Sequence, residues 1–256
     1  MAKSKNSGIH IKTPDEVKIM AEGGAKLGRV KNALAKAVKA GVSAMDIEEL
    51  AAKLIKEEGA EVSFNKVPGY SWATCISVNE GLVHGIPKKE MIFKSGDIVS
   101  VDVGVYFKGF HTDTSISVGI DLSPENQKFL NVGKSALEKA ISKARIGNHL
   151  YLISKAIEDE IEGHGYSTIK ALVGHGVGRE LHEDPQIPCF VPGKIEDSPI
   201  ITEGMVLAVE VMYAAGSDKV EVLEDGWTIA MRDGKMSGLF EETVAITKAG
   251  PKVLTA

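Results

Sequence analysis

The chain has 256 residues, a formal net charge of -5 and 43% hydrophobic residues, values typical of one globular domain with a substantial apolar core. The mild acidity and the lack of a basic block argue against direct nucleic-acid binding. No apolar segment resembles a signal peptide or a membrane span, so we expect no membrane association. Cys75 and Cys189 form no paired motif, which favours the reducing cytoplasm.

The first half of the chain predicts two helices followed by strands. A short basic tail, residues 1–12, precedes a capping box that begins at Thr13 and starts a helix to about Lys39. A second helix follows over about residues 43–58. Beyond it come short β-rich segments, at residues 74–79, 97–107 and 114–119.

The same order of elements then repeats. Helices are predicted over about residues 123–144 and 150–162. Strand-like segments follow at residues 205–213, 227–231 and 243–247. The chain therefore predicts an α+β fold in which residues 13–256 form a single domain, with halves of about 13–120 and 121–248.

The two halves also match residue by residue. One segment of each half, residues 96–103 and 204–211, aligns without gaps, and so do residues 113–118 and 241–246. If the halves fold alike about a pseudo-twofold axis, the acidic residues that coincide will converge. These residues are Asp102 with Glu210 and Asp113 with Glu241.

Carboxylates that converge inside a protein need positive charge nearby to offset the cost of burying their negative charges. Asp102 and Glu210 lie inside apolar strands, so each carboxylate faces away from its valine neighbours. For one isolated acidic residue, a solvent-exposed face is the commoner explanation. Four unpaired carboxylates inside a protein would each cost several kcal/mol, a cost that bound cations remove. We therefore expect two divalent metal ions, drawn from Co, Mn, Fe and Zn.

The histidines fall into two classes. His175 lies among three glycines in GHGVG, where backbone can approach a ligand closely, and this context indicates a functional role. His84 and His182 lie in loop-like segments, where structural and functional roles fit equally well. The remaining histidines lack such a context and are interpreted as structural: His10, His111, His149 and His164.

The chain resembles the type I methionine aminopeptidases, which share the pita-bread fold with creatinases and prolidases. The resemblance extends from about Thr13 to Thr247 through the segments NEGLVHGIP, VDVGVYFKGFHTDTS, GHGVGRELHEDPQIP, GMVLAVE, DGWT and FEET. It implies two pseudo-twofold halves, each with two helices packed on a curved antiparallel sheet. It also implies removal of the N-terminal methionine from nascent proteins and peptides that have a small second residue.

The resemblance also implies roles for individual residues. The implied metal ligands are Asp102, Asp113, His175, Glu210 and Glu241. The implied catalytic residues are Glu210, which would accept a proton from the attacking water, and His84 and His182, which would donate hydrogen bonds to substrate. The implied lining of the methionine pocket is Tyr70, Cys75, Trp227 and Leu181, together with the two substrate-contacting histidines.

Several residues depart from the family pattern without replacing a ligand. They affect the expected pocket shape and are Phe64, Val67, Leu181, Cys189, Phe190 and Leu239.

Three other functions stay open at this point. They are an Xaa-Pro aminopeptidase or prolidase, a non-catalytic ribosome-associated relative and, from the residues alone, a two-metal phosphoesterase. The expected enzyme is a cytoplasmic monomer that acts on nascent polypeptides, at the ribosome.

Overall fold

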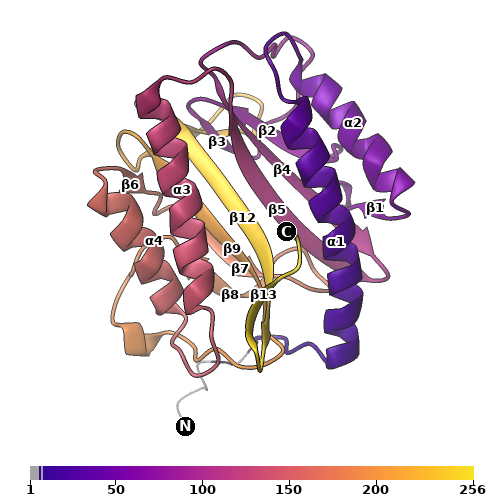
Figure 1. The fold of residues 1–256 in the computed structure, drawn as a ribbon, viewed down its shortest axis with the longest axis vertical. Helices are drawn as coiled ribbons and strands as arrows, with labels where there is room; N and C mark the ends of the chain where they lie inside the picture. The colour runs from indigo at the N-terminus through magenta and orange to yellow at the C-terminus, as the bar shows by residue number, and fades with distance from the viewer. Residues whose placement is uncertain (1–5, 7) are drawn as a thin grey trace.

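The structure is a computed structural model that describes residues 6 and 8–256. Among these residues, four α-helices pack on a large antiparallel sheet (Figure 1). The helices are α1 (Pro14–Ala37), α2 (Ala44–Glu57), α3 (Pro124–Lys143) and α4 (Tyr151–Gly163). None of the helices in the described part of the chain has the length and apolarity that spanning a bilayer requires.

The large sheet has the central strand order β1-β4-β5-β12-β9-β7-β8, and β2, β6 and β13 pair with β4, β9 and β12. Its strands are β1 (Glu61–Val62), β2 (Thr74–Val78), β4 (Ile98–Phe107), β5 (Phe110–Gly119), β6 (Ser167–Thr168), β7 (Val173–Gly176), β8 (Glu183–Pro188), β9 (Val206–Ala214), β12 (Ser237–Thr247) and β13 (Gly250–Val253). A smaller sheet has the order β10-β11-β3. Its strands are β3 (Gly81–Val83), β10 (Val220–Val222) and β11 (Ile229–Met231).

Helix α1 begins where its capping box predicts. The Thr13 hydroxyl accepts from the Glu16 backbone N–H, and the Glu16 carboxylate accepts from the Thr13 N–H. The helix ends at Ala37, two residues before the predicted boundary, because Val38 adopts extended backbone (φ -66°, ψ 109°). Gly41 then turns the chain with a positive φ of 87°, which glycine adopts without steric cost.

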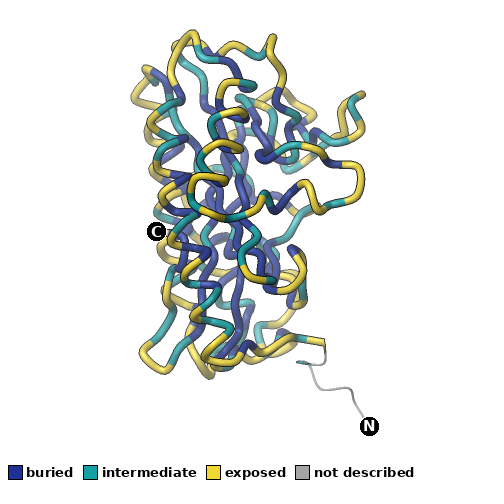
Figure 2. The backbone as a smooth tube through the Cα atoms, turned by 90° about the vertical axis from the view of Figure 1, so that its right-hand side faces the viewer, coloured by how far each residue is buried: buried dark blue, intermediate teal, exposed yellow. Residues whose placement is uncertain are grey.

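Alternation along the long strands separates two faces of the sheet. Val101 and Val103 of β4 pack in one apolar cluster with Leu27 of α1. Val209 and Val211 of β9 pack in a second cluster with residues of α3. Figure 2 shows these strands as a mostly buried layer beside the helices. The residues between the valines therefore point to the face away from the helices.

Hydroxyl side chains join the two halves at the centre of the sheet. The ladder between β5 and β12 contains only the pairs Ser115–Glu241 and Thr114–Glu242. On one side of it, the Ser117 hydroxyl lies 2.9 Å from both the N and the O of Leu239. Beyond the short ladder, β5 and β12 are thus joined by the Ser117 hydroxyl, which satisfies the backbone N–H and carbonyl of Leu239 in place of a backbone partner.

Thr243 makes the matching contact on the other side of the ladder. Its hydroxyl lies 2.9 Å from the Asp113 N and 2.7 Å from the Asp113 O. The backbone of a predicted metal ligand is therefore fixed by a residue 130 positions later in the chain.

Several segments differ from the sequence-based expectation: β12 begins at Ser237 and not at residue 243, and β7 is not predicted from the sequence. The loop predicted after His182 is strand β8, which pairs with β7. The predicted strand over residues 227–231 forms only as β11, in the small sheet, where Ile229 lies opposite Val83 of β3. Strand β8 forms by pairing with the preceding strand β7, whereas β11 pairs with β3, which is distant in the chain, and in both cases strand pairing outweighs the local turn residues.

The predicted tail, residues 1–12, lies partly outside the described residues. Asn6 donates to the Ile200 carbonyl at 3.0 Å, and the Lys12 N–H donates to the Gly204 carbonyl at 2.8 Å. Lys12 is buried. The described part of this segment thus packs against the rest of the chain.

Candidate metal centre

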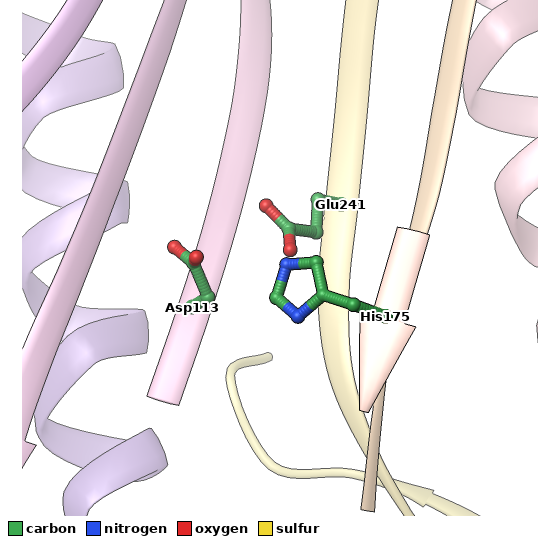
Figure 3. Close-up of side chains that lie close together, drawn as sticks. All are labelled: Asp113, His175 and Glu241. Atoms are coloured by element: carbon green, nitrogen blue, oxygen red, sulfur yellow. The ribbon is translucent and has the colours of Figure 1, made fainter. Parts of the chain in front are cut away.

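Three side chains of metal-binding types meet on the face of the sheet away from the helices. Asp113 of β5, His175 of β7 and Glu241 of β12 are buried, and one ligand atom of each lies within 4.8 Å of those of the others. Figure 3 shows the three side chains pointing toward one another. The residues come from strands far apart in the sequence, so only the folded sheet assembles them.

The other two predicted ligands adjoin this cluster. Asp102 lies close enough to Asp113 that burial and then the charge of Asp113 raise the pKa of Asp102, and Glu210 lies directly opposite Glu241 in the ladder between β9 and β12. One cavity of about 290 Å³ is lined by Asp102, Asp113, His175 and Glu210, among others. The structure therefore brings the five predicted metal-binding residues together.

The pairing of the acid-bearing strands differs between the two halves by two residues, which is one period of side-chain alternation along a strand. Asp102 lies opposite Ser115, and Asp113 lies opposite Gly104, whereas their counterparts Glu210 and Glu241 lie opposite each other. A shift of two residues returns each side chain to the same face of a strand. The carboxylates therefore still converge, although the pairing within the halves is not identical.

Burial dominates the electrostatics of the carboxylates. It raises the pKa of Asp113 to about 7, and burial followed by the charge of Asp113 raises the pKa of Glu210 to about 8. Burial and then the neighbouring carboxylates raise the pKa of Asp102 and Glu241 well above the ordinary range. Without a cation, the folded chain thus favours protonated carboxyl groups here.

Unpartnered acceptors and the histidine tautomer both fit bound cations. Among the described residues, Asp102 Oδ1 and Glu241 Oε1 are buried and have no hydrogen-bond partner. The Nδ1 of His175 lies 2.9 Å from the Gly176 carbonyl oxygen. Because a carbonyl only accepts, Nδ1 carries the proton and Nε2 is left with a free lone pair. Burial, followed by the charge of His182, lowers the pKa of His175 to about 4, which keeps the ring neutral.

The glycines around His175 serve a structural purpose that differs from the predicted one. A Cβ at Gly174 would lie 2.7 Å from the Ala208 carbonyl oxygen, and one at Gly176 would lie 2.3 Å from the Asp184 oxygen. These glycines let the backbone of β7 approach the neighbouring chain segments closely, rather than a ligand. His175 is positioned by this tight packing.

His84 and His182 both line the cavity. The His84 backbone has a positive φ of 56°, and a Cβ at the next residue, Gly85, would lie 2.1 Å from the Ile76 oxygen. The ring of His182 meets that of His175 edge-on at 4.5 Å. Burial lowers the pKa of His182, and burial followed by the charge of His182 lowers that of His84, so both rings favour the neutral form.

An apolar cluster forms another wall of the cavity. It contains Phe64, Tyr70, Cys75 and Leu181, with Val67, Trp72, Ile86 and Trp227 packed against it. The rings of Tyr70 and Trp227 meet edge-on at 5.0 Å, and the Tyr70 hydroxyl donates to the Thr74 carbonyl at 2.8 Å. All four predicted pocket residues therefore line the cavity.

Sequence reasoning missed residues that shape this wall. Met212 lines the cavity two positions after Glu210, so strand alternation could have identified it. The Glu48 carboxylate of α2 accepts from the Ala73 and Thr74 backbone N–H groups at 2.7 and 2.9 Å, which no local pattern predicts. Leu239, a departure expected to affect the pocket, instead packs in the apolar cluster with α3.

Comparisons with known proteins agree with this arrangement. The model of metallopeptidase family M24 matches residues 18–248. Methionine aminopeptidase 1 of Bacillus subtilis is 41% identical, over 96% of this chain and 99% of that protein. The crystal structure of a methionine aminopeptidase from Thermotoga maritima is 40% identical, with a TM-score of 0.92 over 96% of this chain and 99% of that one.

A prolidase from Pyrococcus furiosus shares the fold at lower identity. It is 22% identical, with a TM-score of 0.76, and the match covers 96% of this chain but only 65% of the prolidase. The predicted pita-bread fold is confirmed by these structural neighbours. Because the family model spans nearly the whole chain and the structure gathers a buried set of metal-binding side chains, the chain belongs to metallopeptidase family M24.

Proposed function

We propose that this chain is a metal-dependent aminopeptidase that removes the N-terminal methionine from nascent proteins and peptides, with a preference for a small second residue. One observation carries the proposal. The cavity that contains the carboxylates and His175 is closed by the apolar wall of Tyr70, Cys75 and Trp227. The site thus joins hydrolytic chemistry to a pocket for an unbranched apolar side chain. The relatives named above are methionine aminopeptidases.

Two divalent cations are proposed as the cofactor, one or more of Co, Mn, Fe and Zn. Four carboxylates and one imidazole are the donors that such ions accept. The residues proposed to hold them are Asp102, Asp113, His175, Glu210 and Glu241. When bound, the ions supply Lewis-acid activation of the attacking water and of the scissile carbonyl.

Glu210 is proposed as the proton carrier. Its carboxyl lines the cavity and has a pKa raised to about 8, by burial and then by the charge of Asp113. In the metal-loaded enzyme, this carboxylate would accept a proton from the attacking water and deliver it to the leaving amine. The Cys189 thiol donates to the Glu210 carbonyl oxygen at 3.4 Å, which fixes the backbone from which this side chain extends.

His84 and His182 are proposed to contact the substrate. Both neutral rings line the cavity beside the carboxylates. An imidazole N–H can donate to the substrate amide or to the oxygen that gains charge during attack. The two histidines would orient the scissile bond, while the apolar wall excludes water from the methionine side chain.

The alternative functions fit less well. The prolidase match leaves about a third of that protein uncovered and shows only a shared fold. A non-catalytic relative would have no need of five converging metal-binding side chains. Among the described residues, no lysine or arginine lines the cavity, although phosphate esters usually require such cations. Peptide hydrolysis is therefore the reaction that the site favours.

Residues 13–256 are proposed to act as a single catalytic domain, as a cytoplasmic monomer that acts on chains leaving the ribosome. Cys75 and Cys189 are free and buried, which suits a reducing compartment. Light scattering of the purified chain tests the monomer, and cosedimentation with ribosomes tests the location of the substrate.

Metal reconstitution tests the proposed function. The chain is stripped with a chelator, reloaded with one ion at a time, and assayed on Met-Ala-Ser, Met-Leu-Ser and Ala-Pro-Ser. We expect Met-Ala-Ser to be cleaved only after metal is restored, and Met-Leu-Ser to be cleaved poorly. Cleavage of Ala-Pro-Ser in preference to Met-Ala-Ser, or full activity without metal, would contradict the proposal.

A further inference from the structure

A buried ion pair ties the N-terminal segment to the edge of the candidate active site. The Lys12 ammonium lies 2.6 Å from Glu183 Oε2, and both side chains are at most 5% exposed. The same ammonium donates to the His10 carbonyl at 3.2 Å. The Lys12 backbone is anchored separately, through its N–H to the Gly204 carbonyl. The lysine is thus a fixed part of the structure.

The ion pair fixes the short segment that connects β7 to β8. The second oxygen of Glu183, Oε1, accepts from the Glu180 backbone N–H at 3.2 Å. Within the same segment the Gly178 N–H donates to the Glu180 carbonyl, and the Gly178 carbonyl accepts from the His111 N–H at 2.7 Å. Glu183 therefore connects Lys12 on one side to a closed turn on the other.

Gly178 packs directly on the ion pair. A Cβ at this position would lie 2.5 Å from Lys12 Cε and 2.6 Å from Glu183 Oε1. Such distances are too short for an alanine to fit without moving one of the two charged groups. The glycine thus allows the pair to lie against the backbone of the connecting segment.

A displacement of Glu183 would affect His182, the residue immediately before it. His182 lines the cavity, and its ring contacts that of His175 at 4.5 Å. The His182 side chain and the Glu183 side chain belong to adjacent residues, so a shift of Glu183 moves the backbone that carries His182. A ring displaced by about 1 Å can lose most of its contribution to a transition state.

We infer that Lys12, through its buried contact with Glu183, is a positioning residue that holds His182 in the active site. The inference rests on the proposed function, in which His182 contacts the substrate. It also makes the N-terminal segment part of the active-site support. Lys12 itself does not line the cavity.

The metal-free chain offers a readout that does not depend on turnover. The imidazole signals of His182 are followed by ¹H–¹⁵N NMR in the wild type and in Lys12→Met, Lys12→Arg and Gly178→Ala. We expect Lys12→Met and Gly178→Ala to shift or broaden the His182 signal, and Lys12→Arg to preserve it better. Arg179→Met is the matched control, because Arg179 lies in the same segment but pairs with Glu16 at the surface, with its own side chain 65% exposed.

Activity of the metal-loaded enzyme gives the second readout. We expect Lys12→Met to lower kcat about 10–100-fold, with metal content unchanged and KM changed less than about threefold. In the His182→Ala background, Lys12→Met should lower kcat by no more than about twofold, since the group that it positions is absent. Gly178→Ala should follow the same pattern with both charges retained, and Arg179→Met should match the wild type.

The outcomes separate this inference from the proposed function. A wild-type kcat in His182→Ala would show that His182 has no catalytic role, which overturns both the proposed role of His182 and the need to position it. An impaired His182→Ala enzyme with a normal Lys12→Met enzyme would overturn only the inference. Equal losses from Lys12→Met in both backgrounds would show that Lys12 acts on general stability alone. An unchanged His182 signal would show that Lys12 does not position the ring, which also overturns the inference.

Discussion

Glu210 lies directly opposite Glu241 in the ladder between β9 and β12, so two carboxyl groups share one face of adjacent strands. Like charges placed directly opposite each other destabilise a sheet. Here the arrangement coincides with two further carboxylates and one neutral histidine. Ionised carboxylates in this pairing repel each other, and bound cations would relieve that repulsion.

Removal of the carboxylate of either Asp113 or Glu241 should abolish metal binding and activity together. Asp113→Asn and Glu241→Gln each delete one charge from the three-residue cluster. We expect both to lower the metal content measured by elemental analysis, with loss of peptide hydrolysis. Glu242→Gln is the control: Glu242 pairs with Lys31 and accepts from Thr255, so its loss should lower the Tm and leave the metal content unchanged. Two ions per chain in Glu241→Gln would contradict the assignment.

The metal-free chain should lose stability as the pH rises above about 7.5. The folded-state pKa values of Asp113, about 7, and Glu210, about 8, lie above the unfolded value of about 4. Carboxyl groups raised in this way stabilise the fold at low pH, and the contribution disappears as the pH passes the folded pKa.

The titration of buried histidines limits the pH range in which the effect of the carboxyl groups can be measured. His175, with a pKa lowered to about 4 by burial and then by His182, contributes stability that grows as the pH rises to its unfolded value of about 6.5. His84, His111 and His182 also have lowered pKa values, and histidines of the unfolded chain finish titrating about one pH unit above 6.5. The two effects therefore oppose each other up to about pH 7.5, and the carboxyl groups dominate above it. Urea unfolding with a chelator should therefore show a falling free energy of unfolding above about pH 7.5. Saturating Mn²⁺ should remove the fall, and a rise in the chelated chain would refute this prediction.

The two histidines proposed to contact the substrate, His84 and His182, should affect turnover and leave metal binding unchanged. We expect His84→Ala and His182→Ala each to lower kcat about 10²–10³-fold, as loss of a donor to a developing oxyanion does. The metal content should stay within error of the wild type, because neither ring belongs to the three-residue cluster of Asp113, His175 and Glu241. Release of an ion from His182→Ala would show that this ring is a ligand.

Leu181 should set the tolerance of the methionine pocket. It belongs to the apolar cluster of Phe64, Tyr70 and Cys75, and an apolar pocket discriminates one methylene by only about 1–3 kcal/mol. We expect methionine to be preferred, with norleucine and leucine accepted, and Leu181→Phe to change the ratios. Values of kcat/KM on Met-, norleucine- and Leu-Ala-Ser measure this. Identical ratios in the variant would show that Leu181 does not shape the pocket.

Glu48 should contribute to stability through the strand that carries Cys75. Its carboxylate accepts from the Ala73 and Thr74 N–H groups and from the Thr74 hydroxyl at 2.6 Å. Glu48→Ala would orphan buried donors and should lower the free energy of unfolding by about 2–4 kcal/mol. Denaturation of Glu49→Ala, an exposed neighbour on the same helix, provides the control and should show little change. Equal stability of the two variants would show that the hydrogen bonds to the Glu48 carboxylate do not stabilise the fold.

Local patterns in the chain determined much of the fold and of the site. The capping box at Thr13 and the alternation around Asp102 and Glu210 specify where a helix begins and which residues share a face. The internal repeat predicted that these two carboxylates would converge with Asp113 and Glu241. Such features depend on neighbours in the sequence, so the sequence alone contains them.

Only the tertiary structure determines the register of the strands and the long-range contacts that position the site residues. The two-residue shift that places Asp102 opposite Ser115, and not Asp113, depends on how β4 and β5 pair. The contact of Thr243 with Asp113, and that of Lys12 with Glu183, join residues 130 and 171 positions apart. Their strength comes from burial and hydrogen-bond geometry that exist only after the strands have paired, and no local pattern encodes them.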